Sequence, residues 1–172
     1  MTTTLQPVYG TADSLVSITL TSLGAAGFRQ SLAISNVVTR YLDVLVQLTV
    51  KTGASTPTDS RAVMVYAYGG VPYASGTYYP DGITGTDAAL TDVIAIGGGT
   101  NAVPQHLVYV GAVETPTAAT TYTGGPWAVA KGFGGWLPSI WGIVVLNATG
   151  QTLSATASDH IVRYQGVQGR EV

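Results

Sequence analysis

Only a few side chains in this sequence could act as acids, bases or nucleophiles, and the histidines come first among them. His160 follows Asp159, and few ionisable residues accompany His106. Because neighbouring residues of a strand point to opposite faces, Asp159 and His160 make a poor catalytic pair and a poor bidentate metal site. We therefore expect both histidines to be structural or solvent-facing. The chain has no cysteine, which removes thiol nucleophiles and cysteine-based zinc sites.

The acidic residues suggest two further kinds of site, a calcium site and a glycosidase pair. Asp81, Asp87 and Asp92 lie within or beside one long loop. A calcium site needs six to eight oxygen ligands, and Asp81 between proline and glycine is more simply a turn residue. Glycoside hydrolysis needs two carboxylates across a cleft, and nothing in the sequence places Glu114 or Glu171 opposite an aspartate. We predict neither a metal site nor a glycosidase site.

Two short motifs resemble functional signatures without the context that such signatures need. Gly97-Gly98-Gly99 follows an apolar run, but no Lys-Ser/Thr pair and no helix pattern follow it, so we interpret it as a flexible turn. Asn147-Ala148-Thr149 matches a glycosylation acceptor, and we assign it to a hairpin turn at 147–151. The sequence therefore predicts no catalytic residue, no cofactor and no metal, and a chain that is not an enzyme.

Composition points to function through protein surfaces. Only 9% of the 172 residues are charged, against about 25% in an ordinary domain, while 46% are hydrophobic. The net charge of −2, with scattered Lys and Arg, argues against nucleic acid, and no apolar stretch reaches the roughly 18 residues of a membrane span. Depletion of charge is typical of interface cores, so we expect a homo-oligomer, with a trimer preferred.

Alternating apolar residues predict strands throughout the chain, separated by Gly, Pro, Asn and Asp clusters. The segment 139–147 is apolar on both sides, as in a central strand. We predict an all-β protein, an antiparallel, jelly-roll-like β-sandwich of about eight strands with long Gly-, Tyr- and Thr-rich loops. Residues 1–36 form an N-terminal arm with the first strands, within the same unit as a sandwich at 37–172. The expected strands are 15–20, 30–35, 41–52, 61–68, 89–96, 106–113, 139–147 and 160–165.

Aromatic residues on uncharged loops supply the candidate contact surfaces. The loop 69–88 carries three tyrosines, which either bind a partner or fold back as a lid over the sandwich. A second stretch, 115–126, is Thr- and Ala-rich and is expected to be irregular or an extended arm, and 36–42 holds a helical turn at most. Trp141 begins a core strand and is expected to be buried. The interface candidates are Tyr73, Tyr78, Tyr79, Tyr122, Trp127 and Trp136.

The order of strand and turn motifs resembles small virion structural proteins of tailed bacteriophages. The resemblance covers roughly residues 40–167 and contains no catalytic signature. It implies a virion subunit with a jelly-roll-like sandwich that contacts the major capsid protein or other virion proteins. Residues 1–36 lie outside it and are a candidate partner-clasping arm. The motifs that carry it are Ala62-Val63-Met64-Val65-Tyr66-Ala67-Tyr68-Gly69, Tyr79-Pro80-Asp81-Gly82, Leu137-Pro138-Ser139-Ile140-Trp141-Gly142, Asn147-Ala148-Thr149-Gly150 and Val162-Arg163-Tyr164-Gln165-Gly166.

Three functional hypotheses follow from these patterns. The first is a capsid decoration, or cement, subunit that binds and stabilises the phage head. Its variant is a tail, collar or head-tail connector component. The second is a carbohydrate- or receptor-binding module of a phage tail, based on the tyrosine loop and the tryptophans. The third and weakest is a hydrolase.

Overall fold

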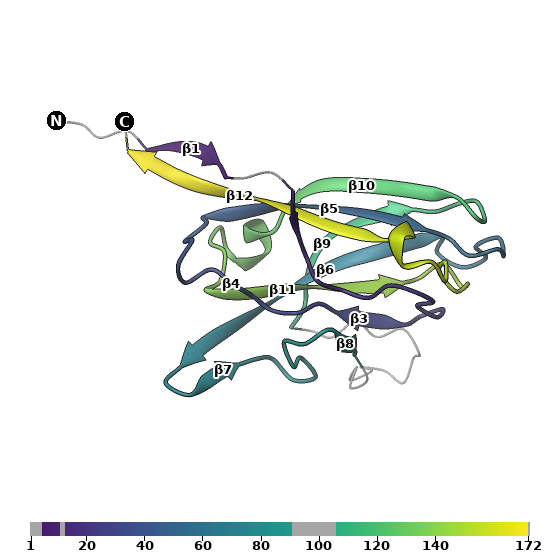
Figure 1. Cartoon of the computed structure of the whole chain (residues 1–172), viewed down its shortest axis with the longest axis horizontal. Helices are drawn as coiled ribbons and strands as arrows, with labels where there is room; N and C mark the ends of the chain where they lie inside the picture. Colours follow the sequence, from purple (N-terminus) through teal and green to yellow (C-terminus); the bar gives the residue numbers. More distant parts are fainter. Residues whose placement is uncertain (1–4, 11–12, 91–105, 172) are drawn as a thin grey trace.

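The computed structural model shows two curled antiparallel β-sheets that face each other, so the protein is an all-β sandwich (Figure 1). The structure describes residues 5–10, 13–90 and 106–171. In this part of the chain the helices are two short 3-10 turns, Ala130–Phe133 (η1) and Ala157–Asp159 (η2). None of them is long enough or apolar enough to cross a lipid bilayer. The predicted antiparallel β-sandwich is confirmed, and its jelly-roll connectivity stays a prediction.

The first sheet is built around two long neighbouring strands, β5 and β12. Each has the period-two pattern of a strand that buries one face. In β5 the even-numbered residues from Val44 to Val50 are completely buried, as the alternation predicts. In order across the sheet, the strands are β1 (Leu5–Tyr9), β12 (Ile161–Glu171), β5 (Asp43–Lys51) and β10 (Thr121–Ala128), and β2 (Ser14–Leu15) also pairs with β12.

The second sheet is centred on β6 and β11, which pair along eight residues of β11. The apolar stretch of β11 is buried on both faces, as expected of a central strand. The predicted burial of Trp141 at its start is also confirmed. The strands are β7 (Gly76–Tyr78), β6 (Ala62–Tyr73), β11 (Ile140–Asn147), β3 (Phe28–Gln30) and β8 (Ala88–Ala89), with β4 (Ile34–Ser35) paired to β11 and β9 (Val108–Glu114) paired to β6.

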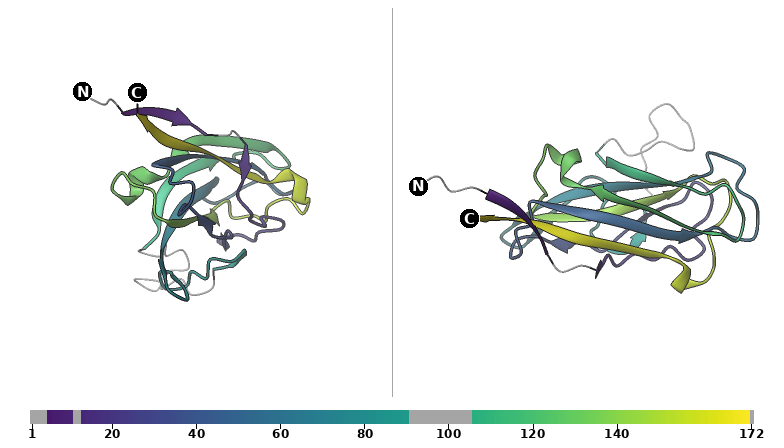
Figure 2. Two further views of the ribbon diagram at one scale, coloured as in Figure 1. Left: turned by 60° about the vertical axis from the view of Figure 1, so that its left-hand side comes forward. Right: turned by 90° about the horizontal axis from the view of Figure 1, so that it is seen from above.

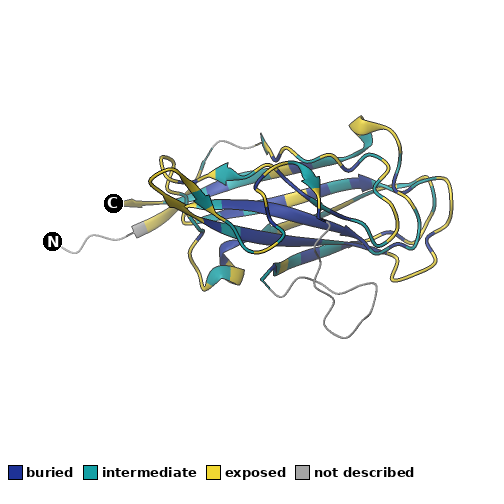
Figure 3. Ribbon diagram, turned by 90° about the horizontal axis from the view of Figure 1, so that it is seen from below, coloured by how far each residue is buried: buried dark blue, intermediate teal, exposed yellow. Residues whose placement is uncertain are grey.

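Hydrophobic side chains form two layers, which explains why β6 and β11 are apolar on both faces. The larger cluster lies between the sheets and contains side chains such as Leu48, Val65 and Ile143. The smaller cluster lies on the other face of the second sheet, where Ile83 and Leu90 from the connecting segments cover it. Burying one such aliphatic side chain contributes about 1.5–3 kcal/mol. Figure 3 shows the buried strands flanked by exposed loops at both ends of the sandwich.

The N-terminal segment runs antiparallel along the outer edge of β12. Tyr9 lies opposite Val167 and Ser14 opposite Tyr164, so five steps on the first segment match three on β12. The pairing with β12 therefore resumes at Ser14 with the register shifted by two residues. Residues 13–36 then contribute β2, β3 and β4, so this part of the N-terminal segment belongs to both sheets.

The last residues of β12 extend past β5. Val167 lies opposite Asp43, the first residue of β5, and the residues after Val167 pair only with β1. We call β1 together with 167–171 the terminal ribbon. In Figure 2 it projects beyond the sandwich at the end where β5 begins.

The prediction of an irregular arm at 115–126 is wrong for its second half. Thr121–Ala128 is strand β10, which pairs with β5 across a register shift between Gly124 and Trp127. Sequence periodicity misses it because the two glycines and the proline hide the alternation of Tyr122 and Trp127.

Several predicted strands have other boundaries in the structure, because strand pairing determines where each strand begins and ends. Within 15–20 only Leu15 is in a strand, although Val16 and Leu20 are buried, and 30–35 is divided between β3 and β4. The loop predicted to begin at residue 69 instead continues β6 to Tyr73 and returns as β7. Of the segment 89–96, only Ala89 belongs to β8, and residues 91–96 lie outside the described residues.

Candidate interaction surface

Exposed hydrophobic side chains gather at one end of the sandwich. This is the end where β5 and β11 begin and where β6, β10 and β12 finish (Figure 1). Twelve large hydrophobic side chains are exposed in the described residues, and nine of them belong to this end. We call these nine the apolar end: Val8, Tyr9, Val37, Val38, Leu42, Val71, Tyr73, Tyr78 and Trp136.

A clamped turn holds two valines of the apolar end in solvent. Asn36 is buried, and its side chain accepts a hydrogen bond from the Tyr41 backbone N–H (2.7 Å) and donates one to the Tyr41 carbonyl oxygen (2.9 Å). The Arg40 backbone N–H donates to the Asn36 carbonyl oxygen, and Arg40 takes a left-handed φ of 50°. Val38 stays 90% exposed at the tip of this turn. Such exposure on a fixed turn is typical of a contact residue rather than of a mobile loop.

The β6–β7 hairpin presents a pair of stacked tyrosines. The rings of Tyr73 and Tyr78 lie 4.3 Å apart at an interplanar angle of 29°. A Cβ atom at Gly76 would lie 3.0 Å from the Tyr73 hydroxyl, so glycine leaves room for the ring. Val71 is exposed on the same hairpin. The stack fixes both rings before any partner arrives, which lowers the entropy cost of binding.

Trp136 is exposed because two glycines turn the chain directly before it. Gly134 and Gly135 have φ angles of 79° and 98°, which favour glycine, and the Gly135 N–H donates to the Ala130 carbonyl oxygen. The next residue, Leu137, is buried and donates its N–H to the Leu42 carbonyl oxygen (3.0 Å). Trp136, which is 70% exposed, is thus held beside the clamped turn.

The terminal ribbon is tied to the same turn. The Gln168 side-chain amide donates to the Thr39 carbonyl oxygen (3.0 Å). The Tyr41 ring covers Gly10 and Gly166, where any Cβ atom would meet it. These contacts join the ribbon to the body of the sandwich and bring its exposed Val8 and Tyr9 to the apolar end.

Three of the six predicted contact residues lie at the apolar end, and three do not. Tyr73, Tyr78 and Trp136 are exposed there. Tyr79 is half-buried, with its ring against Gly70 and Gly85 and edge-on to a core tyrosine at 6.1 Å, as the lid alternative described.

Tyr122 and Trp127 support the β9–β10 region from within. Tyr122 packs against the inter-sheet core, and its hydroxyl accepts a hydrogen bond from the Thr117 backbone N–H (2.9 Å). Trp127 lies against Gly111 and Gly124, where a larger residue would clash with the indole. Both side chains are half-buried and act in packing.

Sequence reasoning missed the valines at 37, 38 and 71. Two consecutive valines after an asparagine resemble the start of an apolar strand, and only the Asn36 clamp shows that they remain outside. The sequence contained one usable signal, Asn36, because an asparagine side chain can close a turn by hydrogen bonds to the backbone of nearby residues.

The opposite end of the sandwich is polar. It consists of the loops 52–61, 115–120 and 148–160, which join β5 to β6, β9 to β10 and β11 to β12. None of the exposed large hydrophobic side chains of the described chain lies in these loops. Asn147 shows how this end is organised, because its buried side chain donates to the carbonyl oxygens of Leu23, Gly24 and Gln151. Asn147 is therefore a structural clamp, and its completely buried amide is closed to a glycan.

Of the ionisable residues considered as chemical sites, His160 and Asp159 form local hydrogen bonds. His160 is half-buried with Nε2 2.9 Å from the Ser154 carbonyl oxygen, and His106 precedes β9. A hydrogen bond from Ser154 and the ammonium of Lys51 at 3.2 Å lower the pKa of Asp159 below its ordinary value. Within the described residues, His, Asp and Glu form no group of three that could hold a metal ion. Asp92 lies outside those residues, and Asp81 is exposed in its predicted turn.

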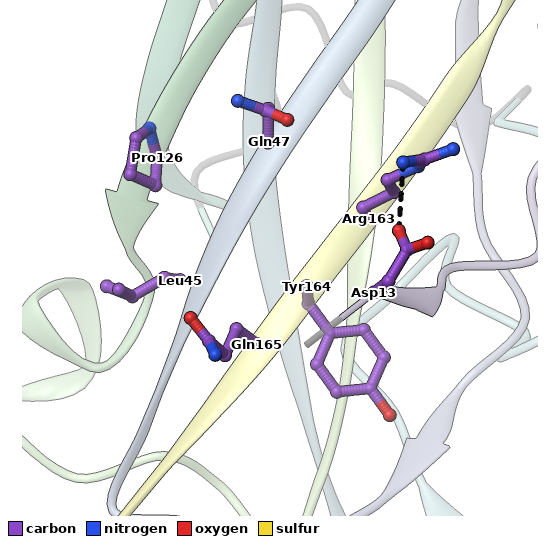
Figure 4. Close-up of a pocket in the computed structure, with 7 residues that line it drawn as sticks. All are labelled: Asp13, Leu45, Gln47, Pro126, Arg163, Tyr164 and Gln165. Carbon is purple, nitrogen blue, oxygen red and sulfur yellow. Dashed lines mark ion pairs between the residues drawn. The ribbon is translucent and has the colours of Figure 1, made fainter. Parts of the chain in front are cut away.

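A shallow hollow of about 280 Å³ lies on the outer face of the first sheet (Figure 4). Gln47, Gln165 and the ion pair of Arg163 with Asp13 (2.9 Å) line it. Tyr164 also borders it, but the ring packs edge-on against Trp141 in the core. The hollow therefore offers amide and charged groups without an exposed aromatic platform.

No protein family, no curated protein and no solved structure matches this chain. Its surfaces therefore carry the functional argument, and the apolar end is the candidate site.

Proposed function

We propose that this chain is a non-enzymatic virion structural protein, a capsid decoration subunit that binds and stabilises the head of a tailed bacteriophage. The observation that carries the proposal is that, in the part of the chain the structure describes, nine of twelve exposed large hydrophobic side chains gather at one end of the sandwich. Surface patches of this kind are typical of protein-protein contact sites. The major capsid protein is the proposed partner and the virion the proposed location.

The apolar end suits attachment to a large surface. Trp and Tyr are the residues that most often dominate binding energy, and here four of them, Tyr9, Tyr73, Tyr78 and Trp136, project from three separate segments. The turns that carry the exposed side chains of the apolar end are fixed by the Asn36 clamp, by the Tyr73–Tyr78 stack and by Gly134-Gly135. A rigid subunit that spans neighbouring capsid subunits adds apolar contact area between them and resists their separation.

Substitution at the apolar end tests the proposal. We expect Trp136→Ser combined with Val38→Ser to weaken binding to phage heads at least about tenfold, because both side chains lose buried contact area. Leu15→Ser is the matched control, since Leu15 is 66% exposed but lies on β2, away from the apolar end. Quantitative mass spectrometry of purified particles measures how many copies of each variant are bound per head. Absence of the wild-type chain from the particles contradicts the proposal.

Two alternatives remain as proposals. A tail, collar or head-tail connector subunit would use the same apolar end, and cryo-electron microscopy of the particle distinguishes its position. The exposed rings of Tyr78 and Trp136 favour a second candidate, a carbohydrate- or receptor-binding module, because sugars stack on exposed aromatic rings. Loss of glycan-array binding in Tyr78→Ala, with head binding unchanged, would support that module instead.

A further inference from the structure

Three cationic side chains accompany the apolar end. Arg40 lies on the clamped turn, Lys131 on η1 and Arg170 on the terminal ribbon, and all three are exposed. None forms an ion pair with a carboxylate whose side chain the structure describes. The one acidic side chain described on these segments, Asp43, already accepts hydrogen bonds from two backbone N–H groups, those of Val44 and Ala130 (2.7 Å each).

Basic residues elsewhere are mostly neutralised. Arg29, Lys51 and Arg163 each pair with an aspartate at 2.6–3.2 Å. Arg61 at the polar end is the remaining basic residue outside the apolar end, and it forms no ion pair among the described side chains. Among the described side chains around the apolar end, three cations stand against one carboxylate, Asp43, so in a chain that is only 9% charged this surface is net positive.

The exposed apolar area of this end approaches that of one side of a standard interface. The aromatic side chains Tyr73, Tyr78 and Trp136 are 46%, 67% and 70% exposed. With the aliphatic residues around them they offer on the order of 600 Å² of apolar surface, against about 800 Å² per partner in a standard interface.

Charge decides which partner fits this surface. A second copy docked face to face would bring three cations against three cations, which costs free energy at a desolvated interface. An anionic lipid surface attracts clusters of about four to eight Lys and Arg, more than the three found here. A protein surface with apolar side chains and carboxylates satisfies both the hydrophobic and the cationic residues.

We infer that the apolar end docks on an apolar protein surface edged by Asp or Glu side chains, which pair with Arg40, Lys131 and Arg170. The inference rests on the proposed function, in which this surface belongs to the phage shell. The guanidinium groups of Arg40 and Arg170 can each bind a carboxylate through two parallel hydrogen bonds. The cations therefore set the orientation, and the aromatic side chains supply most of the contact area.

The test measures binding of the purified chain to phage shells assembled without it, at about 50 mM and about 500 mM salt. We expect the wild-type affinity to fall with salt, and Arg40→Glu with Lys131→Glu to lower it at least about tenfold at low salt. The matched control is Arg61→Glu, an exposed cation at the polar end, which should bind as the wild type does. Unchanged thermal melting verifies that the variants fold.

Every other result of these binding measurements overturns either the inference or the proposed function. Binding that is equal in wild type and charge-reversed chain overturns the inference while the decoration role stands. If the wild type fails to bind any shell, the proposed function itself falls. Self-association in sedimentation velocity that Trp136→Ser abolishes would identify a second copy as the occupant. Sedimentation with phosphatidylserine vesicles that Lys131→Glu abolishes would identify a membrane, and either result overturns the inference.

Discussion

At the scale of single residues, Asp87 joins three segments that are distant in sequence. Its carboxylate accepts hydrogen bonds from the Thr19 backbone N–H (3.1 Å), the Thr19 hydroxyl (2.6 Å) and the Arg29 Nε (2.6 Å). Partial burial raises the pKa of Asp87, but these donors outweigh it and hold the pKa below its ordinary value. Asp87 is therefore a structural link between segments of the chain.

The first prediction is that Asp87→Asn lowers the free energy of unfolding at neutral pH by about 1–2 kcal/mol. Because the folded-state pKa is depressed, the stabilisation is present above the unfolded pKa of about 4 and is lost as pH falls through the folded value. Urea unfolding at a series of pH values should therefore show a weaker acid dependence in the variant. Asp81→Asn, at an exposed turn, is the control. Parallel stability-pH curves for Asp87→Asn and wild type would refute the assignment.

Which aromatic residues are exposed could be predicted only in part. Of the aromatic residues that the sequence proposes as contact residues, Tyr73, Tyr78 and Trp136 are exposed, and composition alone could not separate them from the half-buried Trp127. The difference depends on residues across the fold, because the Trp127 ring lies over Gly111 of another strand. A glycine that accepts a ring from a neighbouring strand becomes visible only once the two strands are in register.

At the scale of elements, the period-two pattern located β5, which buries one face, and runs that are apolar on both sides located β6 and β11, which are buried on both faces. The short strand β1 was not predicted, because its pairing with β12 comes from a distant partner rather than from a local pattern.

In the terminal ribbon, the hydrogen-bond pairing of β1 with β12 determines which way Pro7 faces. The Gly10 N–H donates to the Gly166 carbonyl oxygen, so Val8 and Gln168 form the next hydrogen-bonded pair in the antiparallel ladder. Pro7 then faces outward and costs the ladder no bond, while it removes one donor from the exposed edge. The exposed edge of β1 is therefore poorly suited to pairing with a strand of a partner. We expect a partner to contact this end through side chains instead.

The second prediction concerns this ribbon. Deletion of residues 1–9 should expose the backbone N–H groups of Gln168 and Arg170, because β1 supplies their acceptors. Hydrogen exchange followed by NMR should show faster exchange at these two amides, with Leu48 in the core strand β5 as the protected control. Unchanged exchange at Gln168 would contradict the assigned register.

At the scale of the whole molecule, the sandwich has two different ends. Nine of the twelve exposed large hydrophobic side chains of the described residues lie at one end, with Arg40, Lys131 and Arg170, and Thr-, Ser- and Gly-rich loops lie at the other. The low charge content of the sequence indicated an interaction surface but not its position. That position depends on which strand ends meet, since the turn at 36–42, the β6–β7 hairpin and Trp136 are remote in sequence.

The last prediction uses this polarity. The same short Gly/Ser epitope is inserted at one of two exposed turns. Between Ala54 and Ser55 it lies at the polar end, and between Ala74 and Ser75 it lies at the apolar end. Both chains should fold, because inserts in exposed turns cost little stability. We expect the first insertion to leave head binding unchanged and the second to weaken it at least about tenfold by keeping the Tyr73–Tyr78 stack from its partner. Co-sedimentation with phage heads measures both, and stronger loss from the insertion at Ala54 would place the docking surface at the polar end instead.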